Sequence, residues 1–131
     1  MFRVGITTNR QIGLVLVGDL LCIALFATLG AMRHPASGRL LARVPEIAAP
    51  FVVGWLLVGL AVGTLRADAY ADTRTAVVRA AIAWLGTDLF AQALRATPIV
   101  PGGAAPAFFV VALLFGGLFL GGWRALAVRA V

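Results

Sequence analysis

The chain has 131 residues, of which 62% are hydrophobic and 12% are charged, and its mean hydropathy is +1.02. Soluble domains average about 45–50% apolar and about 25% charged residues. This composition excludes a soluble globular enzyme and a disordered chain. Because a spanning helix needs about 20 apolar residues, residues 1–131 have room for one membrane domain of four spans with short connections.

Four apolar stretches divide the chain, and each has about the length of one span. They cover residues 11–32, 47–65, 75–94 and 105–123, and clusters of Pro, Gly and charged residues separate them. In lipid, backbone groups are satisfied only within helices or closed barrels, and the alternation of barrel strands is not visible here. We therefore predict an all-α membrane protein, a bundle of four transmembrane helices.

Two further features concern the first half of the chain. The first apolar stretch follows a basic segment, as in a signal peptide, but its length of about 20 residues exceeds the 7–15 of a signal peptide, so we expect it to stay as an anchor. The first connection contains Leu40, Leu41 and Val44 beside two arginines. This pattern predicts a short helix that lies in the membrane interface.

The charge balance indicates a membrane orientation. Eleven basic residues, all Arg, stand against five acidic ones, and they are scattered singly at the ends of apolar runs. Such scatter is typical of membrane flanks and argues against nucleic-acid binding, which needs a basic patch. With the N-terminus inside, seven arginines lie on the inner side and four on the outer side, so the positive-inside rule predicts both termini in the cytoplasm and a location in the cell membrane. The inner set is Arg3, Arg10, Arg66, Arg74, Arg79, Arg124 and Arg129, and the outer set is Arg33, Arg39, Arg43 and Arg95.

Two aspartates lie inside predicted spans, where an ionisable side chain costs about 2.5–3.5 kcal/mol on insertion scales. They are Asp19 in the first span and Asp88 in the third. Each is either structural, bonded across a helix interface, or part of a path for a solute or a proton. We keep both hypotheses open.

The third span carries a polar stripe that includes Asp88. Its members share one helix face because they are spaced by 4, 4 and 3 residues, and they are Trp84, Asp88, Gln92 and Arg95. Arg79 lies on the opposite face, so we expect it either to extend to the inner surface or to reach Asp19. Trp55 and Trp84 lie deeper than an aromatic belt, either as packing anchors or as the wall of a ligand cavity. The candidate polar site therefore consists of Asp19, Trp55, Arg79, Trp84, Asp88, Gln92 and Arg95.

Zinc binding, nucleophilic catalysis and phosphate binding each lack the residues that they need. The lone Cys22 and lone His34 cannot assemble a zinc site, no nucleophile has a base at useful spacing, and the pair Gly102-Gly103 has no Lys or Ser/Thr of a phosphate loop. We expect no cofactor, no metal and no enzymatic activity. Glycines at spacing four, Gly59 with Gly63 and Gly117 with Gly121, predict close helix contacts. A homodimer packed through Gly117 and Gly121 is one outcome of this pattern.

Several short segments together resemble a known family. They include Gly18-Asp19, Ala49-Pro50-Phe51, Gly54-Trp55, Leu94-Arg95, Gly102-Gly103-Ala104, Phe109-Val110 and Trp123-Arg124, with His34 after Gly30. In this order they are similar to the domain-of-unknown-function family 3054, short four-helix membrane proteins of prokaryotes. The resemblance implies the fold and brings no known activity. Val100-Pro101 stands where a second His is expected, which weakens a two-histidine metal site.

Three functional classes fit these features. The first is a non-catalytic accessory or assembly protein whose buried polar groups fix helix packing, and we favour it. The second is movement of a small solute, ion or proton through an oligomer by way of Asp19 and Asp88. The third, an intramembrane enzyme acting on lipid, lacks a nucleophile–base pair or a metal cluster.

The predicted orientation can be tested by thiol labelling. In a Cys22→Ser background, a cysteine at Ser37, between the first and second spans, should react with an impermeant reagent added outside the cell, because this connection is predicted to lie outside. Labelling of this position from the cytoplasmic side only would contradict the orientation.

Overall fold

The computed structural model describes residues 9–32, 40–99 and 104–130. It contains four long α-helices and one short 3₁₀ helix. These are α1 (Asn9–Met32), α2 (Leu40–Val62), η1 (Ala67–Tyr70), α3 (Thr73–Arg95) and α4 (Pro106–Ala130). All four α-helices are long and apolar enough to cross a membrane. The predicted all-α architecture with four membrane-spanning helices is confirmed.

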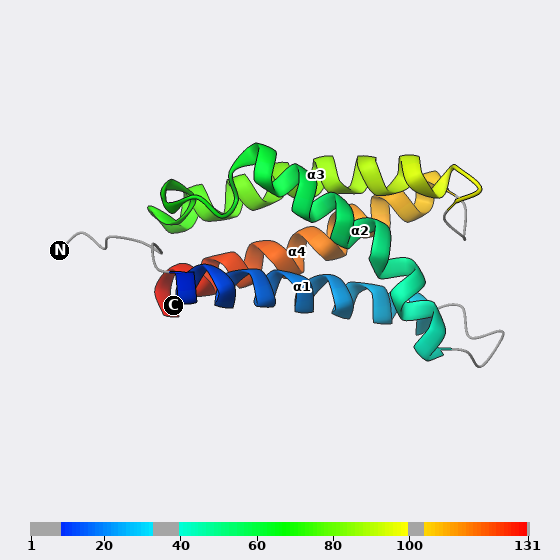
Figure 1. The fold of residues 1–131 in the computed structure, drawn as a ribbon, viewed down its shortest axis with the longest axis horizontal. Helices are drawn as coiled ribbons and strands as arrows, with labels where there is room; N and C mark the ends of the chain where they lie inside the picture. The colour runs from blue at the N-terminus through cyan, green and yellow to red at the C-terminus, as the bar shows by residue number, and fades with distance from the viewer. Residues whose placement is uncertain (1–8, 33–39, 100–103, 131) are drawn as a thin grey trace.

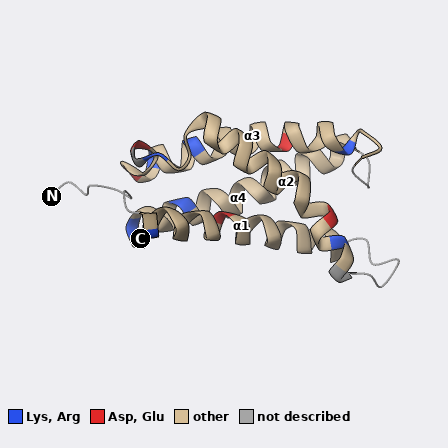
Figure 2. Ribbon diagram, in the orientation of Figure 1, with Lys and Arg blue, Asp and Glu red and all other residues tan. Residues whose placement is uncertain are grey.

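Successive helices run in opposite directions and close into a ring (Figure 1). The start of α1, the end of α4 and the α2–α3 connection lie at one end of the bundle, which we call the terminal end. The opposite end, where α1 leads to α2 and α3 leads to α4, is called the loop end. Helix α1 packs against α2 and α4, and α3 packs against the same two helices. Basic residues gather toward both ends, and acidic residues also occur within the helices (Figure 2).

Helix α2 begins earlier than its apolar stretch. It starts at Leu40 rather than near residue 47, so the short interfacial helix predicted around Leu40 and Val44 is the beginning of α2 itself. Pro45 and Pro50 lie inside the helix, and each removes one intrahelical N–H donor. Membrane helices tolerate such prolines because neighbouring helices and local adjustments satisfy the freed backbone groups.

Helix α4 ends later than its apolar stretch. It continues to Ala130 instead of ending at Trp123, because the residues from Ala125 to Val128 are apolar and Arg124 is buried inside the bundle. Helices α1 and α3 differ from their predicted bounds by at most two residues at either end.

A glycine with positive φ ends α2. Gly63 has φ of 86°, a conformation that side chains rarely adopt. The N–H groups of Gly63 and Thr64 both donate to the carbonyl of Gly59, at 2.8 and 2.9 Å. The Gly59–Gly63 pair was expected to form a helix contact face, but Gly63 instead acts as the left-handed cap of α2. The chain then enters η1, and Asp72 caps the start of α3 by accepting a hydrogen bond from the Thr75 N–H at 2.7 Å.

Aromatic side chains from all four helices form the core, with Trp84 of α3 at its centre. The Trp84 ring stacks on Phe51 of α2 at 5.4 Å between centroids and meets Phe26 of α1 edge-on at 5.9 Å. Phe108 of α4 stacks on Phe26 at 6.0 Å. Each such pair contributes about 0.5–1.5 kcal/mol beyond the burial of its area. This aromatic cluster therefore ties the four helices together.

Two glycines make room for tryptophan rings. A Cβ atom on Gly116 of α4 would overlap the Trp84 ring, and a Cβ atom on Gly18 of α1 would overlap the Trp123 ring. Trp84 is also fixed by its Nε1–H, which donates to the Ala112 carbonyl at 2.8 Å. The Trp123 ring is held in the same way, since its Nε1–H donates to the Val15 carbonyl, so the close approach of these helices depends on both glycines.

The glycines predicted to meet a second copy lie beside α3 of the same chain. A Cβ on Gly117 would come within 3.6 Å of Trp84 Cδ1, and one on Gly121 within 3.7 Å of Val77 Cγ1. A large side chain at Gly117 would therefore disturb the packing of a single chain as well as any dimer. The homodimer stays a prediction.

The Gly116–Trp84 contact predicts a sharp difference between two neighbouring substitutions. Gly116→Ala should lower the free energy of unfolding by about 1–3 kcal/mol, because the added methyl group overpacks against a buried and hydrogen-bonded ring. Gly122→Ala, in the same helix, has no heavy atom within 4 Å of the new Cβ and should be neutral or slightly stabilising. Reversible unfolding in mixed micelles measures both. Equal effects of the two substitutions would contradict the described contact.

Candidate functional site

A buried ion pair joins the first helix to the last. Asp19 of α1 is 0% exposed and Arg124 of α4 is 1% exposed. Arg124 Nη2 donates to Asp19 Oδ2 at 2.6 Å, and Arg124 Nε donates to Asp19 Oδ1 at 2.8 Å. This two-point contact between a guanidinium and a carboxylate has a defined geometry and is among the stronger hydrogen-bonded pairs in proteins.

The rest of the guanidinium is bonded to the connection that follows α2. Arg124 Nη1 donates to the Thr64 carbonyl at 2.7 Å and to the Tyr70 hydroxyl at 3.3 Å. The Tyr70 hydroxyl in turn donates to the Thr64 carbonyl at 2.6 Å. Burial raises the pKa of Tyr70, so its hydroxyl stays neutral and keeps its proton to donate. Both Nη1 bonds anchor the connection to the bundle.

Trp55 of α2 completes the bonding of the carboxylate. Its Nε1–H donates to Asp19 Oδ2 at 3.2 Å, so the carboxylate accepts three hydrogen bonds. The Arg124 Cζ atom also lies 5.7 Å from the Trp55 ring centroid and 5.3 Å from that of Tyr70, within the range of cation–π attraction. We call these five residues the Asp19–Arg124 network: Asp19, Trp55, Thr64, Tyr70 and Arg124. A buried ion pair is stable only when its desolvation is offset by bonding of this kind.

Arg79 does not belong to this network. Its Nη1 donates to Asp68 Oδ1 at 2.8 Å and to the Gly63 carbonyl at 3.4 Å, which directs the side chain toward η1 at the terminal end. This hydrogen bond lowers the pKa of the exposed Asp68 carboxyl. The hypothesis that Arg79 reaches Asp19 is wrong, because Arg124 holds that carboxylate.

The residues of the polar stripe on α3 make separate contacts with different partners. Asp88 is 0% exposed, and its Oδ1 accepts a hydrogen bond from Gln92 Nε2 at 3.1 Å. Trp84, one turn earlier, donates to a backbone carbonyl of α4 instead. Arg95 lies with its Cζ 4.6 Å above the Phe108 ring. The seven candidate residues therefore do not converge on a single site.

Two groups of polar residues remain, one around Asp19 and the other around Asp88. Trp55, which bonds to Asp19, and Trp84, one turn before Asp88, have ring centroids 6.4 Å apart. Each carboxyl group thus has its own hydrogen-bonding partners.

The sequence reasoning missed three residues of the network. Arg124 was counted among the inner flanking arginines because it follows the predicted end of the fourth span. Thr64 was placed at the end of the second apolar stretch and Tyr70 in the connection after it. The apolar residues after Arg124, from Ala125 to Val128, were the signal that this arginine lies within a span. The carbonyl of Thr64 and the hydroxyl of Tyr70 leave no comparable signal in the sequence, since their role depends on how the connection folds back.

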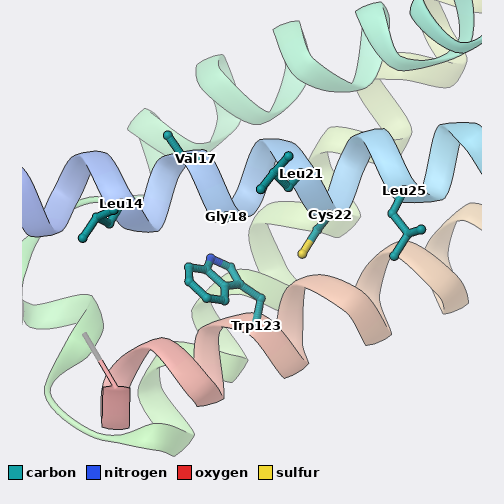
Figure 3. A pocket seen from close by; sticks show the side chains of 7 residues that line it. All are labelled: Leu14, Val17, Gly18, Leu21, Cys22, Leu25 and Trp123. Carbon is teal, nitrogen blue, oxygen red and sulfur yellow. The ribbon is translucent and has the colours of Figure 1, made fainter.

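An open apolar groove lies between α1 and α4 (Figure 3). Its volume is about 390 Å³, and it is lined by Leu14, Val17, Gly18, Leu21, Cys22, Leu25 and Trp123. The Trp123 ring extends from α4 toward α1 (Figure 3), and its Nε1–H donates to the Val15 carbonyl at 3.1 Å. Its polar atom is therefore bonded within the bundle. Neither Asp19 nor Asp88 lines this groove.

Within the part of the chain that the structure describes, no three His, Cys, Asp or Glu side chains gather as a metal site. His34 and the pair Gly102-Gly103, which the sequence singles out, lie outside the described residues.

The four apolar helices and the buried network define a multi-pass membrane protein. The chain belongs to the family described as protein of unknown function (DUF3054), whose model matches residues 16–127. The resemblance noted in the sequence is thereby confirmed. No curated protein and no solved structure matches the chain.

The ion pair predicts strong coupling between two substitutions. Asp19→Asn and Arg124→Gln should each lower the free energy of unfolding by about 3–5 kcal/mol, because each leaves a buried charge without its counterion. The double variant should lose clearly less than the sum of the two. Unfolding of the purified protein in mixed micelles measures all three.

Arg129→Gln is the matched control for this cycle. Arg129 lies in the same helix and is exposed, so its replacement should change stability by less than about 0.5 kcal/mol. Additive losses from Asp19→Asn and Arg124→Gln would show that the two residues do not interact.

Proposed function

We propose that this protein is a small non-catalytic accessory or assembly protein of the membrane. The observation that carries the proposal is the bonding of the Asp19–Arg124 network: a carboxylate with three hydrogen bonds and a guanidinium with four, all within the bundle. A carboxylate that binds and releases a solute must exchange partners during transport. This one is held by three N–H groups of two side chains, Trp55 and Arg124, and does not line the groove, which supports a structural role.

Transport of a proton or small cation is the second candidate, and one observation favours it. Within the part of the chain that the structure describes, Asp88 Oδ2 is buried and has no hydrogen-bond partner, so this acceptor is available to a proton or a cation. The path would then run along α3 or between two copies of the chain. A homodimer that uses the exposed parts of the α4 glycine face around Gly117 and Gly121 is part of this candidate.

We also propose that both termini are cytoplasmic and that the protein lies in the cell membrane. Arg124 no longer counts as a flanking residue, since it is buried and paired with Asp19. Without Arg124, the inner set predicted from the sequence has six arginines and the outer set has four. The inner set is still the larger one, so the positive-inside rule supports the same orientation.

Water accessibility of residue 88 separates the two candidates. In a Cys22→Ser background, Asp88→Cys should resist a charged, water-soluble thiol reagent in native membranes, because an accessory protein needs no aqueous path to this position. Ala71→Cys is the control for labelling efficiency, since Ala71 is exposed at the terminal end and should react.

Ion flux provides the complementary measurement. Proteoliposomes with the wild-type protein should show the same proton and cation leak as protein-free vesicles under an imposed gradient. A pH-dependent flux that Asp88→Asn abolishes, in a variant that still folds, would overturn the accessory role in favour of transport, because Asn keeps the shape of the side chain but cannot ionise.

A further inference from the structure

Asp88 and Gln92 each have one buried oxygen atom that lacks a hydrogen-bond partner among the described residues. Asp88 and Gln92 lie one turn apart on α3, and Gln92 Nε2 donates to Asp88 Oδ1 at 3.1 Å. The other oxygen of each group, Asp88 Oδ2 and Gln92 Oε1, is buried without a partner. Both atoms are acceptors when Asp88 is ionised. The ionised form therefore leaves two unsatisfied acceptors in the interior of a membrane protein, which is costly.

One proton satisfies both atoms. If Asp88 Oδ2 carries a hydrogen, this hydroxyl can donate to Gln92 Oε1, while Gln92 Nε2 continues to donate to Asp88 Oδ1. Carboxylic acid and primary amide then form a pair with two parallel hydrogen bonds. Turning the amide over exchanges its nitrogen and oxygen. The Gln92 oxygen then faces Asp88 Oδ1, and a proton is needed between these two atoms instead. One proton on Asp88 is therefore required in either orientation of the amide.

The surroundings of Asp88 are apolar and aromatic. Trp84 lies one turn before it and stacks on Phe51, and Arg95 lies two turns after it above Phe108. The rings of Phe51 and Phe108 are 5.9 Å apart. Asp88 is thus at the level of the aromatic cluster, where an ionised group is poorly solvated.

The charged groups of the neighbouring helices have other positions or partners. On α3 itself, Arg95 is the nearest charged residue in the sequence. Helix α1 contributes Asp19, and α4 contributes Arg124, but these two bind each other. Helix α2 contributes Arg43 and Glu46 near the loop end, and Glu46 is exposed. In contrast to Asp19, whose partner is a guanidinium, Asp88 has an amide as its hydrogen-bonded side-chain partner.

We propose that Asp88 and Gln92 form an intramembrane proton-binding site, in which Asp88 holds a proton at neutral pH and donates it to Gln92 Oε1. The proton comes from bulk water as the protein folds, and the carboxylate becomes a neutral carboxylic acid. This site is independent of the accessory or transport role, because a bound proton serves either one. It explains how the third span carries Asp88 without a counterion bonded to it.

Infrared spectroscopy tests the proposal directly. In the wild-type protein in lipid at neutral pH, we expect the carbonyl stretching band of a protonated carboxylic acid, shifted by ¹³C labelling of aspartate. Asp88→Asn should remove this band, and Asp68→Asn should leave it unchanged, because Asp68 is exposed and paired with Arg79. Gln92→Met should shift the band by removing both hydrogen bonds. Absence of the band from the wild type, or its persistence in Asp88→Asn, would overturn the proposal.

Stability against pH provides a second readout. Asn is the neutral analogue of a protonated Asp and can form the same two hydrogen bonds with Gln92, so Asp88→Asn should keep the melting temperature, whereas Asp88→Leu should lower it. The folded wild type binds one proton more at this site than an unfolded chain, whose aspartates ionise above about pH 4. Its stability should therefore fall as the pH rises, and this slope should be weaker in Asp88→Asn. An Asp88→Asn variant as unstable as Asp88→Leu would contradict the proposal, and Gln92→Met keeps the infrared test available in that case.

Discussion

The rest of the structure depends on the need of one arginine for partners in an apolar interior. Arg124 lies in α4 and can be stable there only if a counterion and several acceptors surround it. Asp19 supplies the counterion from α1, which brings the first and last helices together. The carbonyl of Thr64 and the hydroxyl of Tyr70 supply the remaining acceptors, which draws the α2–α3 connection against the bundle. A single guanidinium thus closes the ring of helices at the terminal end.

The aromatic cluster has the same role nearer the middle of the bundle, by packing rather than by charge. Helices in lipid gain nothing from excluding water from each other, so their association depends on close packing and hydrogen bonds. Trp84 provides both, since its ring contacts Phe51 and Phe26 and its N–H bonds to Ala112. Such a large ring fits between α3 and α4 only because Gly116 lacks a side chain.

The sequence was sufficient for the architecture because lipid leaves few alternatives: four apolar stretches must become four helices. It was sufficient for the Asp88–Gln92 contact as well, since residues four apart on a helix are neighbours whatever the rest of the chain does. It was insufficient for the Asp19–Arg124 pair. That contact depends on the relative depth and rotation of α1 and α4, which periodicity within one helix does not define. For the same reason the spacing along α3 does not reveal that Arg79 bonds to Asp68 rather than to Asp19.

The two buried aspartates differ in how the charge of a carboxyl group is neutralised in the apolar interior. Asp19 is neutralised by a guanidinium from another helix, so any change in its charge would break contacts among three helices and the connection. Asp88 has its one hydrogen-bonded side-chain partner, Gln92, on the same helix, and a single proton would neutralise it, so its charge can change while the helix contacts around Asp19 stay in place. A response to pH or to a partner that requires a reversible change in charge is therefore compatible with the bundle at Asp88 and incompatible with it at Asp19. Taking up or losing a proton at Asp88 therefore affects one hydrogen bond within α3, whereas at Asp19 it affects three hydrogen bonds between helices.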